Sequence, residues 1–222
     1  MPTTVTILGC GGSGGVPFAG GVWGACNPCN PYNRRTRSSV LISRGHTQLV
    51  IDTGPDFHAQ INRVGFTGLL TGVLYTHSHA DHVAGIDDLR AFCFAAEKPV
   101  PAYGSKMTLE DLFRRDGHVF SHTGLGYPTM AQAHTLHAHQ KIDDLDVWAF
   151  ELPHGDITST GFRVGDFGYI SDASTLTPEA LNQLQNLELL MIGTTHHTTA
   201  GQHPTIKDVL GWFEQLRPKK RC

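Results

Sequence analysis

Three histidines and an aspartate stand close together in the sequence, at His77, His79, Asp81 and His82. Neutral imidazole and carboxylate groups together suit zinc, manganese or iron. On an extended segment, His77 and His79 point to the same side and can bind one ion. Asp81 and His82 come after a bend and can bind a second ion. A chance cluster is disfavoured, because burying four such groups without a partner would cost several kcal/mol.

The flanking residues indicate that this cluster is a turn between a strand and a helix. Residues 72–75 form a short apolar, β-prone run that is typical of a buried strand. After the cluster, Val83, Ile86 and Leu89 recur at helical spacing. Another expected strand ends at Asp52, and we expect its carboxylate to cap the metal-binding turn or to hydrogen-bond to it.

Two further candidate ligands follow other expected strands. His154 comes just after the strand at residues 146–152 and can complete the ligand set of the first ion. Asp172 follows the strand at residues 167–170 and can bridge two ions. Two cations about 3.5–4 Å apart can generate hydroxide at neutral pH and clamp the oxygens of a phosphoryl group. These residues therefore suit the hydrolysis of a phosphodiester with two divalent ions, zinc or manganese.

Length and composition indicate one globular domain. The 222 residues are enough for a single domain with a sizeable core, which we expect to span residues 1–222. A net charge of -3 argues against a general nucleic-acid binder and leaves a small molecule as the expected partner. Five cysteines without regular spacing favour a reducing cytoplasm. No signal segment and no apolar run of about 18–20 residues is visible, so no membrane partner is expected.

Periodicity predicts a mixed α/β domain with two strand–strand–helix runs, which suits two mixed sheets. The expected strands are residues 4–8, 39–42, 48–51, 72–75, 99–104, 146–152, 160–164, 167–170 and 189–192, and the expected helices are residues 56–64, 86–94, 109–113, 178–187 and 206–216. The histidine-rich region 117–141 is interpreted as an insertion or lid, in which His122 is the first candidate for substrate contact.

Three features of the N-terminal region leave alternatives open. The glycine-rich residues 9–17 are either a tight turn packed near the metal-binding turn or a loop whose backbone contacts the substrate. Cys26 and Cys29 make half of a zinc knuckle, but a closed zinc site needs four ligands, so unmetallated thiols are favoured over structural zinc. The arginine run at residues 34–37 is either a solvated strand edge or a surface that reaches phosphate.

The string His-Ser-His-Ala-Asp-His after an apolar strand resembles the metal motif of the metallo-β-lactamase superfamily. The resemblance implies an αββα metallo-β-lactamase sandwich and covers nearly the whole chain. Within the superfamily, the chain is similar to the PhnP-type phosphoribosyl 1,2-cyclic phosphate phosphodiesterases. The segments that carry this similarity are residues 9–17, 23–29, 76–82, 120–123, 152–154, 169–172 and 202–204.

The resemblance also implies roles for individual residues. It implies a site for two ions, whose ligands are His77, His79 and His154 for one ion, Asp81 and His82 for the other, and Asp172 as a bridge. His203 matches the family's catalytic histidine, and an ordinary histidine pKa near ~6.5 suits a general acid for the leaving group. His203 and Asp81 are therefore the candidate catalytic residues. The expected substrate is a small phosphodiester, for example a cyclic ribose phosphate.

Two features depart from the family's pattern. The family usually continues past residues 219–221 into one more strand, whose histidine binds the second ion, and this chain ends first. Three alternatives would account for the missing histidine. The sequence is truncated, the second ion is bound weakly, or His196 or His197 takes the place of that ligand. The family's structural zinc, where present, uses three loop cysteines and a late histidine, whereas this loop has two cysteines.

Other functions remain as alternatives to a phosphodiesterase. They are an RNase Z-like nuclease, a thioesterase or iron-dependent dioxygenase of the same fold, and a truncated, metal-poor binding module. The expected nuclease arm rich in lysine and arginine is not visible in the sequence. The oligomeric state is left open, with a homodimer as one alternative.

Overall fold

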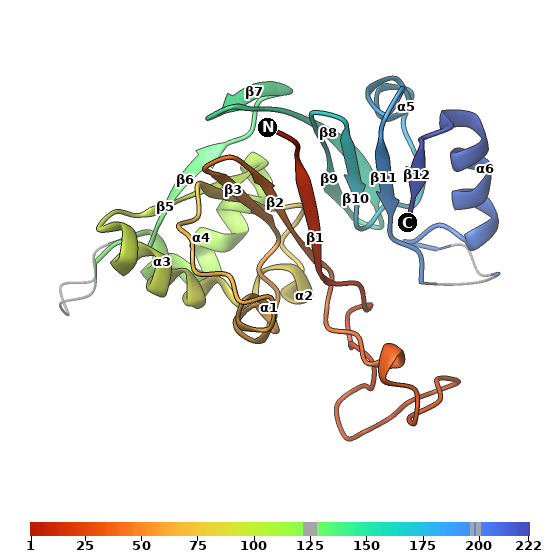
Figure 1. Ribbon diagram of the computed structural model, residues 1–222, viewed down its shortest axis with the longest axis horizontal. Coiled ribbons are helices and arrows are strands. Elements are labelled where there is room, and N and C mark those ends of the chain that lie inside the picture. Colours follow the sequence, from red (N-terminus) through yellow and green to blue (C-terminus); the bar gives the residue numbers. More distant parts are fainter. Residues whose placement is uncertain (122–127, 196–197, 199–200) are drawn as a thin grey trace. The chain divides into compact units, whose positions relative to one another are not determined.

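The structure, a computed structural model, describes residues 1–121, 128–195, 198 and 201–222. The chain divides into two compact units, residues 1–135 and 136–222. Each unit contains one six-stranded mixed sheet, in which the strands follow one another in chain order (Figure 1). Among the described residues, no helix has both the length and the apolar character needed to cross a membrane.

The sheet of the first unit places four parallel strands side by side. Its central strands β3, β4 and β5 are parallel neighbours, so their carboxyl ends meet at one edge of the sheet. Buried side chains from these strands and from the helices, such as Val50, Val73 and Phe57, form one core. The strands are β1 (Thr4–Gly9), β2 (Ser39–Arg44), β3 (Thr47–Ile51), β4 (Gly72–Leu74), β5 (Val100–Gly104) and β6 (Ala131–Thr135). The helices are η1 (Pro31–Asn33), α1 (Phe57–Arg63), α2 (Ala80–Val83), η2 (Ile86–Asp88), α3 (Leu89–Ala96) and α4 (Lys106–Phe120).

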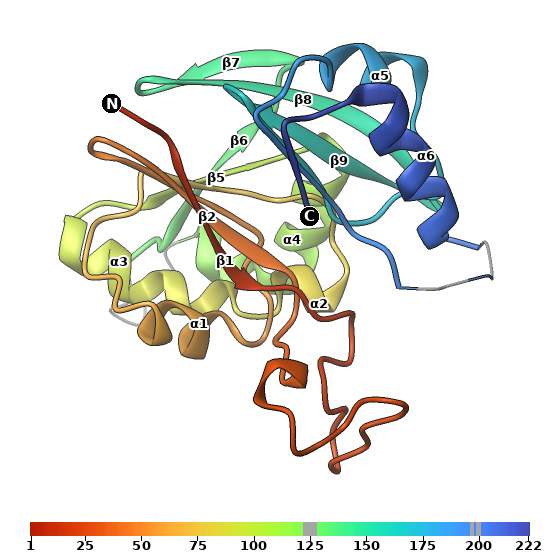
Figure 2. The ribbon, with the colours of Figure 1, turned by 45° about the vertical axis from the view of Figure 1, so that its right-hand side comes forward.

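The segment between β1 and β2 extends away from the first sheet (Figures 1 and 2). Its glycine-rich start packs against residues 35–38, with Gly11 N–H donating to Thr36 O at 2.7 Å and Val16 N–H donating to Arg35 O at 2.8 Å. A Cβ at Gly9 would lie 2.0 Å from the carbonyl oxygen of Arg37. The glycines therefore allow one stretch of backbone to approach another closely.

The second unit covers one face of its sheet with two helices. Phe150, Leu152 and Leu190 of the sheet share an apolar core with Leu184, near the end of the first helix, and Phe213 of the second helix. Its strands are β7 (His139–Ile142), β8 (Leu145–His154), β9 (Ile157–Val164), β10 (Phe167–Ile170), β11 (Leu189–Ile192) and β12 (Lys220–Arg221), and its helices are α5 (Pro178–Gln183) and α6 (Ile206–Leu216).

Several elements differ from the sequence predictions. Helix α4 runs over residues 106–120, whereas the apolar pattern predicts residues 109–113 alone. Strand β9 begins at Ile157, because Gly155, at a φ of 59°, allows a tight turn directly after His154. Residues 220–221 form β12 beside β11, where no strand is predicted. The region 117–141 contains the end of α4, strand β6 and the start of β7, while His122 lies outside the described residues.

Helix α6 begins with a reciprocal cap between Thr205 and Asp208. The backbone N–H and the hydroxyl of Thr205 donate to Asp208 Oδ2 at 2.9 and 2.6 Å, and Asp208 N–H donates to Thr205 Oγ1 at 3.2 Å. The hydrogen bonds from Thr205 lower the pKa of the Asp208 carboxyl. The stabilisation is therefore fully present above the pKa of the unfolded chain and is lost as the pH falls through the lower pKa of the folded chain.

We expect Asp208→Asn to lower the midpoint of thermal unfolding near neutral pH. The difference from the unmodified chain should shrink in acid, below the folded pKa of Asp208, because the carboxyl is then protonated in both states. Glu214→Gln, an exposed carboxylate later in α6, is the matched control and should leave the midpoint nearly unchanged. A difference that does not depend on pH would contradict the capping role of the carboxylate.

Candidate metal centre

The buried carboxylate of Asp52 organises the metal-binding turn of the first unit. Asp52 follows β3 at a φ of 62°, and it is fully buried beside the end of the parallel strand β4. Thr76 N–H donates to Asp52 Oδ1 at 2.8 Å, the Thr76 hydroxyl donates to Oδ2 at 2.7 Å, and His82 Nδ1 lies 2.7 Å from Oδ2. The contact expected between Asp52 and the turn is thus confirmed.

These hydrogen bonds fix the tautomers of two histidines. Since Asp52 accepts, His82 Nδ1 carries a hydrogen and its Nε2 keeps a lone pair. The Thr76 hydroxyl donates to Asp52, so its oxygen accepts from His77 Nδ1 at 3.0 Å, which leaves the lone pair of His77 on Nε2. Burial raises the pKa of Asp52, while His82 and Thr76 oppose the shift by stabilising the carboxylate. The result is two imidazoles prepared to bind a cation through Nε2.

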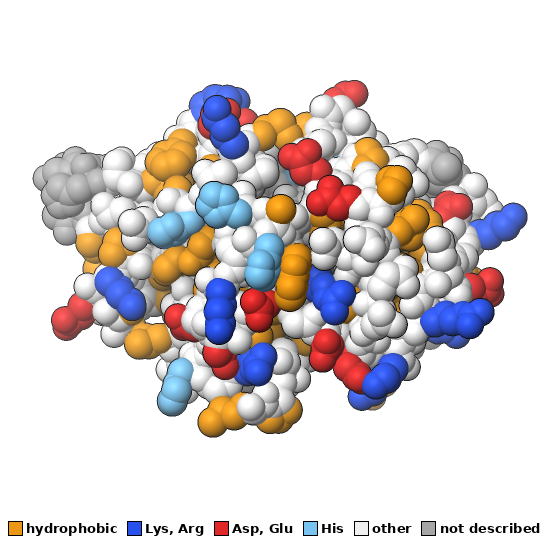
Figure 3. Space-filling model, turned by 90° about the horizontal axis from the view of Figure 1, so that it is seen from above, with side chains coloured by type: hydrophobic (Ala, Val, Ile, Leu, Met, Phe, Trp, Pro, Cys, Tyr) orange, Lys and Arg blue, Asp and Glu red, His pale blue; other side chains and the backbone are white. Residues whose placement is uncertain are grey.

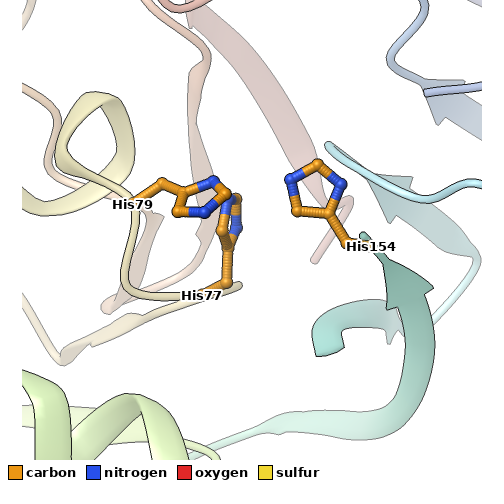
Figure 4. Close-up of side chains that lie close together, drawn as sticks. All are labelled: His77, His79 and His154. Atoms are coloured by element: carbon orange, nitrogen blue, oxygen red, sulfur yellow. The ribbon is translucent and has the colours of Figure 1, made fainter. Parts of the chain in front are cut away.

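The four clustered residues lie together in the first unit. The centroid of the His77 ring lies 4.6 Å from that of the His79 ring and 4.2 Å from that of the His82 ring. His82 Nε2 lies 3.3 Å from Asp81 Oδ2, so a carboxylate oxygen stands beside the nitrogen that keeps its lone pair. Figure 4 shows His77 and His79 on the segment after β4. Three imidazoles and a carboxylate in this arrangement are a suitable donor set for zinc or manganese.

Two glycines allow the turn after β3 to pack tightly against the metal-binding turn. A Cβ at Gly54 would lie 2.1 Å from Asp81 O, and a Cβ at Gly85 would lie 2.2 Å from Gly54 O. Gly85 N–H also donates to Thr53 O at 2.8 Å. Sequence reasoning missed both contacts, although a glycine directly after a strand-ending Asp-Thr is a signal for a close backbone approach.

In the second unit, His154, Asp172 and His203 lie together. One ligand atom of each lies within 4.8 Å of those of the other two. His203 Nδ1 is 2.9 Å from Asp172 Oδ1, and the rings of His154 and His203 are 5.0 Å apart in an edge-on arrangement. His154 is buried at the end of β8, where Figure 4 shows its ring. The unit therefore gathers two imidazoles and a carboxylate at one point.

The backbone of Gln202 determines which nitrogen of His154 remains available. His154 Nδ1 lies 3.0 Å from Gln202 O, and a carbonyl can only accept, so Nδ1 carries the hydrogen and Nε2 keeps its lone pair. Gly155, directly after His154, has a φ of 59°, a left-handed conformation that favours glycine. The carbonyl of Gln202 is a partner that no local sequence pattern reveals.

The remaining candidate residues from the sequence are two histidines, two cysteines and the arginine run. His196 and His197, the alternative ligands for a second ion, lie outside the described residues. Cys26 is partly exposed, Cys29 is exposed, and neither belongs to a group of potential metal ligands among the residues that the structure describes. The arginine run is not wholly solvated, because Arg37 Nη1 lies 3.1 Å from both carboxylate oxygens of Asp56.

Comparisons with known proteins identify related chains. The model of the β-lactamase superfamily domain matches residues 47–222. A crystal structure described as a new diphosphatase from the PhnP family is 27% identical, with a TM-score of 0.89 over 100% of this chain and 87% of the other. The short form of human tRNase Z is 19% identical, with a TM-score of 0.70 over 99% of this chain and 93% of the other, which shows the fold alone.

A curated relative is an octanoyltransferase from Porphyromonas gingivalis, which is 30% identical over 214 residues. The alignment covers 95% of this chain but only 43% of that longer protein. The matched family model and the matched structures share the metallo-β-lactamase fold. The mixed α/β fold class predicted from the sequence is confirmed.

We expect Asp52→Asn to weaken metal binding by about 10- to 100-fold, as is usual when a partner of a metal-binding histidine is changed. An asparagine tolerates the positive φ but offers one acceptor oxygen and two donors. In one orientation, the NH2 group of the asparagine faces Thr76 N–H, which is also a donor. In the other orientation, the NH2 group donates to His82 Nδ1, so the ring hydrogen of His82 moves to Nε2. Competition with a chelator measures the affinity.

The matched control for that change is Asp56→Asn, which alters a carboxylate four residues away that pairs with Arg37. Circular dichroism should show that both variants are folded. Unchanged metal affinity in folded Asp52→Asn would contradict the role of Asp52 in fixing the histidine tautomers.

We expect Gly85→Ala to lower the free energy of unfolding by at least about 1–3 kcal/mol, the usual cost of overpacking, because the new Cβ meets backbone that cannot move aside. The control is Gly117→Ala in α4, where the new Cβ has no heavy atom within 4 Å. Urea denaturation measures both. Equal stability of the two variants would contradict the tight packing of the turns.

Proposed function

Because the chain belongs to the metallo-β-lactamase superfamily, we propose that it hydrolyses a small phosphate ester or anhydride with the help of divalent metal ions. The observation that carries this proposal is the hydrogen-bond chain from Asp52 through Thr76, which leaves Nε2 of His77 and His82 ready to bind a cation. A histidine-rich turn without a ligand would not need both rings fixed in the same tautomer.

The proposed ligands follow the sequence analysis. His77, His79 and His154 hold one ion, Asp81 and His82 hold a second, and Asp172 bridges them. The donor set supports zinc or manganese, since imidazole and carboxylate ligands suit both. When bound, such ions lower the pKa of water and neutralise charge on phosphoryl oxygens. The protein's own part is to fix each ring, through Asp52 and Thr76 in the first unit and the Gln202 carbonyl in the second.

Two substrate classes fit this chemistry. A small phosphodiester, such as a cyclic ribose phosphate, is supported by the motifs that resemble PhnP-type phosphodiesterases. A diphosphate is supported by the 27% identical structure that is described as a diphosphatase. Both classes require attack of water on phosphorus and departure of an oxygen. On the face in Figure 3, lysine and arginine side chains lie among acidic ones, which favours a small substrate over nucleic acid for that face.

His203 is the proposed proton donor to the leaving oxygen. Its Nδ1 lies 2.9 Å from Asp172 Oδ1. In this proposal the Asp172 carboxylate orients the ring, and Nε2 donates the proton. The His203 side chain is 24% exposed, which is compatible with access for a small molecule. Asp172 would then serve both as a ligand and as the group that holds the proton donor in place.

We expect metal-dependent turnover of an aryl phosphodiester, or of a nucleoside diphosphate, by protein loaded with manganese or zinc. His79→Ala should reduce the turnover to the level of the chelated control, because it removes a proposed ligand. Exposed His137→Ala, which alters a histidine outside the cluster, should retain full activity. If neither substrate is hydrolysed with manganese or with zinc, the proposed function is contradicted.

We expect His203→Ala to lower kcat by about 10²–10⁴-fold, the usual contribution of a general acid, while metal content stays unchanged. A substrate with a nitrophenolate leaving group should be less affected, because that group needs little protonation. Loss of metal from His203→Ala, measured by elemental analysis, would instead identify His203 as a ligand.

A further inference from the structure

Helix α4 holds the residue that stands between two proposed metal ligands. Ser78 lies between His77 and His79 in the segment that follows β4. Its hydroxyl donates to Asp111 Oδ2 at 2.7 Å, and its backbone carbonyl accepts from Arg115 Nη1 at 3.0 Å. Asp111 and Arg115 are four residues apart in α4 and therefore lie on the same face of that helix. One helix thus binds both the side chain and the main chain of Ser78.

Both side chains that hold Ser78 are themselves held by neighbours in α4. Arg114 Nη1 lies 3.0 Å from Asp111 Oδ1, so the two carboxylate oxygens contact different groups. Arg115 Nε donates to Asp116 Oδ2 at 3.3 Å. These contacts restrict the rotamers of Asp111 and Arg115, so the positions of the groups that face Ser78 are defined before any ligand binds.

The contacts of Asp111 and Arg115 with Ser78 act on the segment that carries His77 and His79 rather than on the stability of the whole fold. Asp111 and Arg115 are 33% and 44% exposed, and ion pairs with such exposure contribute little to global stability. The Asp52 network holds Thr76 and His82, one on each side of the segment, and Ser78 lies between these two anchors. In an extended segment Ser78 points away from the side of His77 and His79. Holding Ser78 therefore fixes the backbone from which both imidazoles project.

We propose that Asp111 and Arg115 are positioning residues that set the geometry of the His77–His79 pair through Ser78. This inference rests on the proposed function, since it assumes that both histidines bind metal. Neither residue is close to the histidine motif in sequence, and nothing in the motif itself requires an acidic and a basic residue one helical turn apart.

The test uses cobalt(II) as a probe with the 222-residue chain, in the variants Ser78→Ala, Asp111→Ala and Arg115→Gln. We expect cobalt binding to weaken by about tenfold, the lower end of the range for groups that orient metal ligands, and the visible absorption of the bound cobalt to change. The unfolding midpoint of the metal-free protein should stay nearly constant. Arg115→Lys, which keeps a donor, should recover part of the affinity.

The matched control is Glu110→Gln, because Glu110 lies in the same helix and pairs with Lys106 at 3.8 Å on an exposed surface. Its cobalt affinity and spectrum should equal those of the unmodified chain. The double variant Ser78→Ala with Asp111→Ala should bind cobalt no more weakly than either single variant, because both changes remove the same hydrogen bond.

Two results would overturn the inference, and they have different meanings. If the unmodified chain binds cobalt and all three variants bind it with the same affinity and spectrum, the positioning role is wrong while the proposed function stands. If the unmodified chain binds no cobalt, both the positioning role and the proposed function are wrong.

Discussion

The hydrogen bonds to the buried carboxylate of Asp52 are the constraint on which the rest of the site depends. A fully buried carboxylate is costly, and its pKa is raised by burial, so the fold must supply donors to keep it charged. The donors come from Thr76 and His82, on both sides of the metal-binding turn. The same bonds that stabilise the carboxylate therefore fix the turn and the tautomers of two histidines.

In each unit, the proposed metal ligands and the residues that orient them lie at or just after the ends of strands. In the first unit, Asp52 and Thr76 follow the parallel neighbours β3 and β4. In the second unit, His154 ends β8 and Asp172 follows β10, where a Cβ at Gly193 would lie 2.0 Å from Ser171 O. Strand ends are well suited to this purpose, because the ladder fixes the backbone while the next residues are free to turn.

Much of the fold and of the metal-binding turn could be predicted from the sequence, because the residues that form each feature are close together in the chain. The motif at residues 77–82 lies between an apolar strand and helical spacing, and the hairpin at Gly165 has a turn signal. The sequence does not predict strands β6 and β7. In Ala-Gln-Ala-His-Thr the apolar positions are alanines, which have low β propensity, so such a strand depends on pairing with its neighbour, β5 for β6 and β8 for β7. The contact of Asp111 with Ser78 joins residues 33 positions apart, which no periodicity reveals.

In the proposed function, imidazoles and carboxylates of this chain hold divalent cations for phosphoryl chemistry. The most direct measurement is a crystal structure of the manganese-loaded protein with anomalous scattering recorded at the manganese edge. We predict anomalous peaks within bonding distance of the six proposed ligands, which are His77, His79, Asp81, His82, His154 and Asp172. Peaks confined to other parts of the chain, such as the pair Cys26 and Cys29, or no peak at all at the six ligands, would contradict the account.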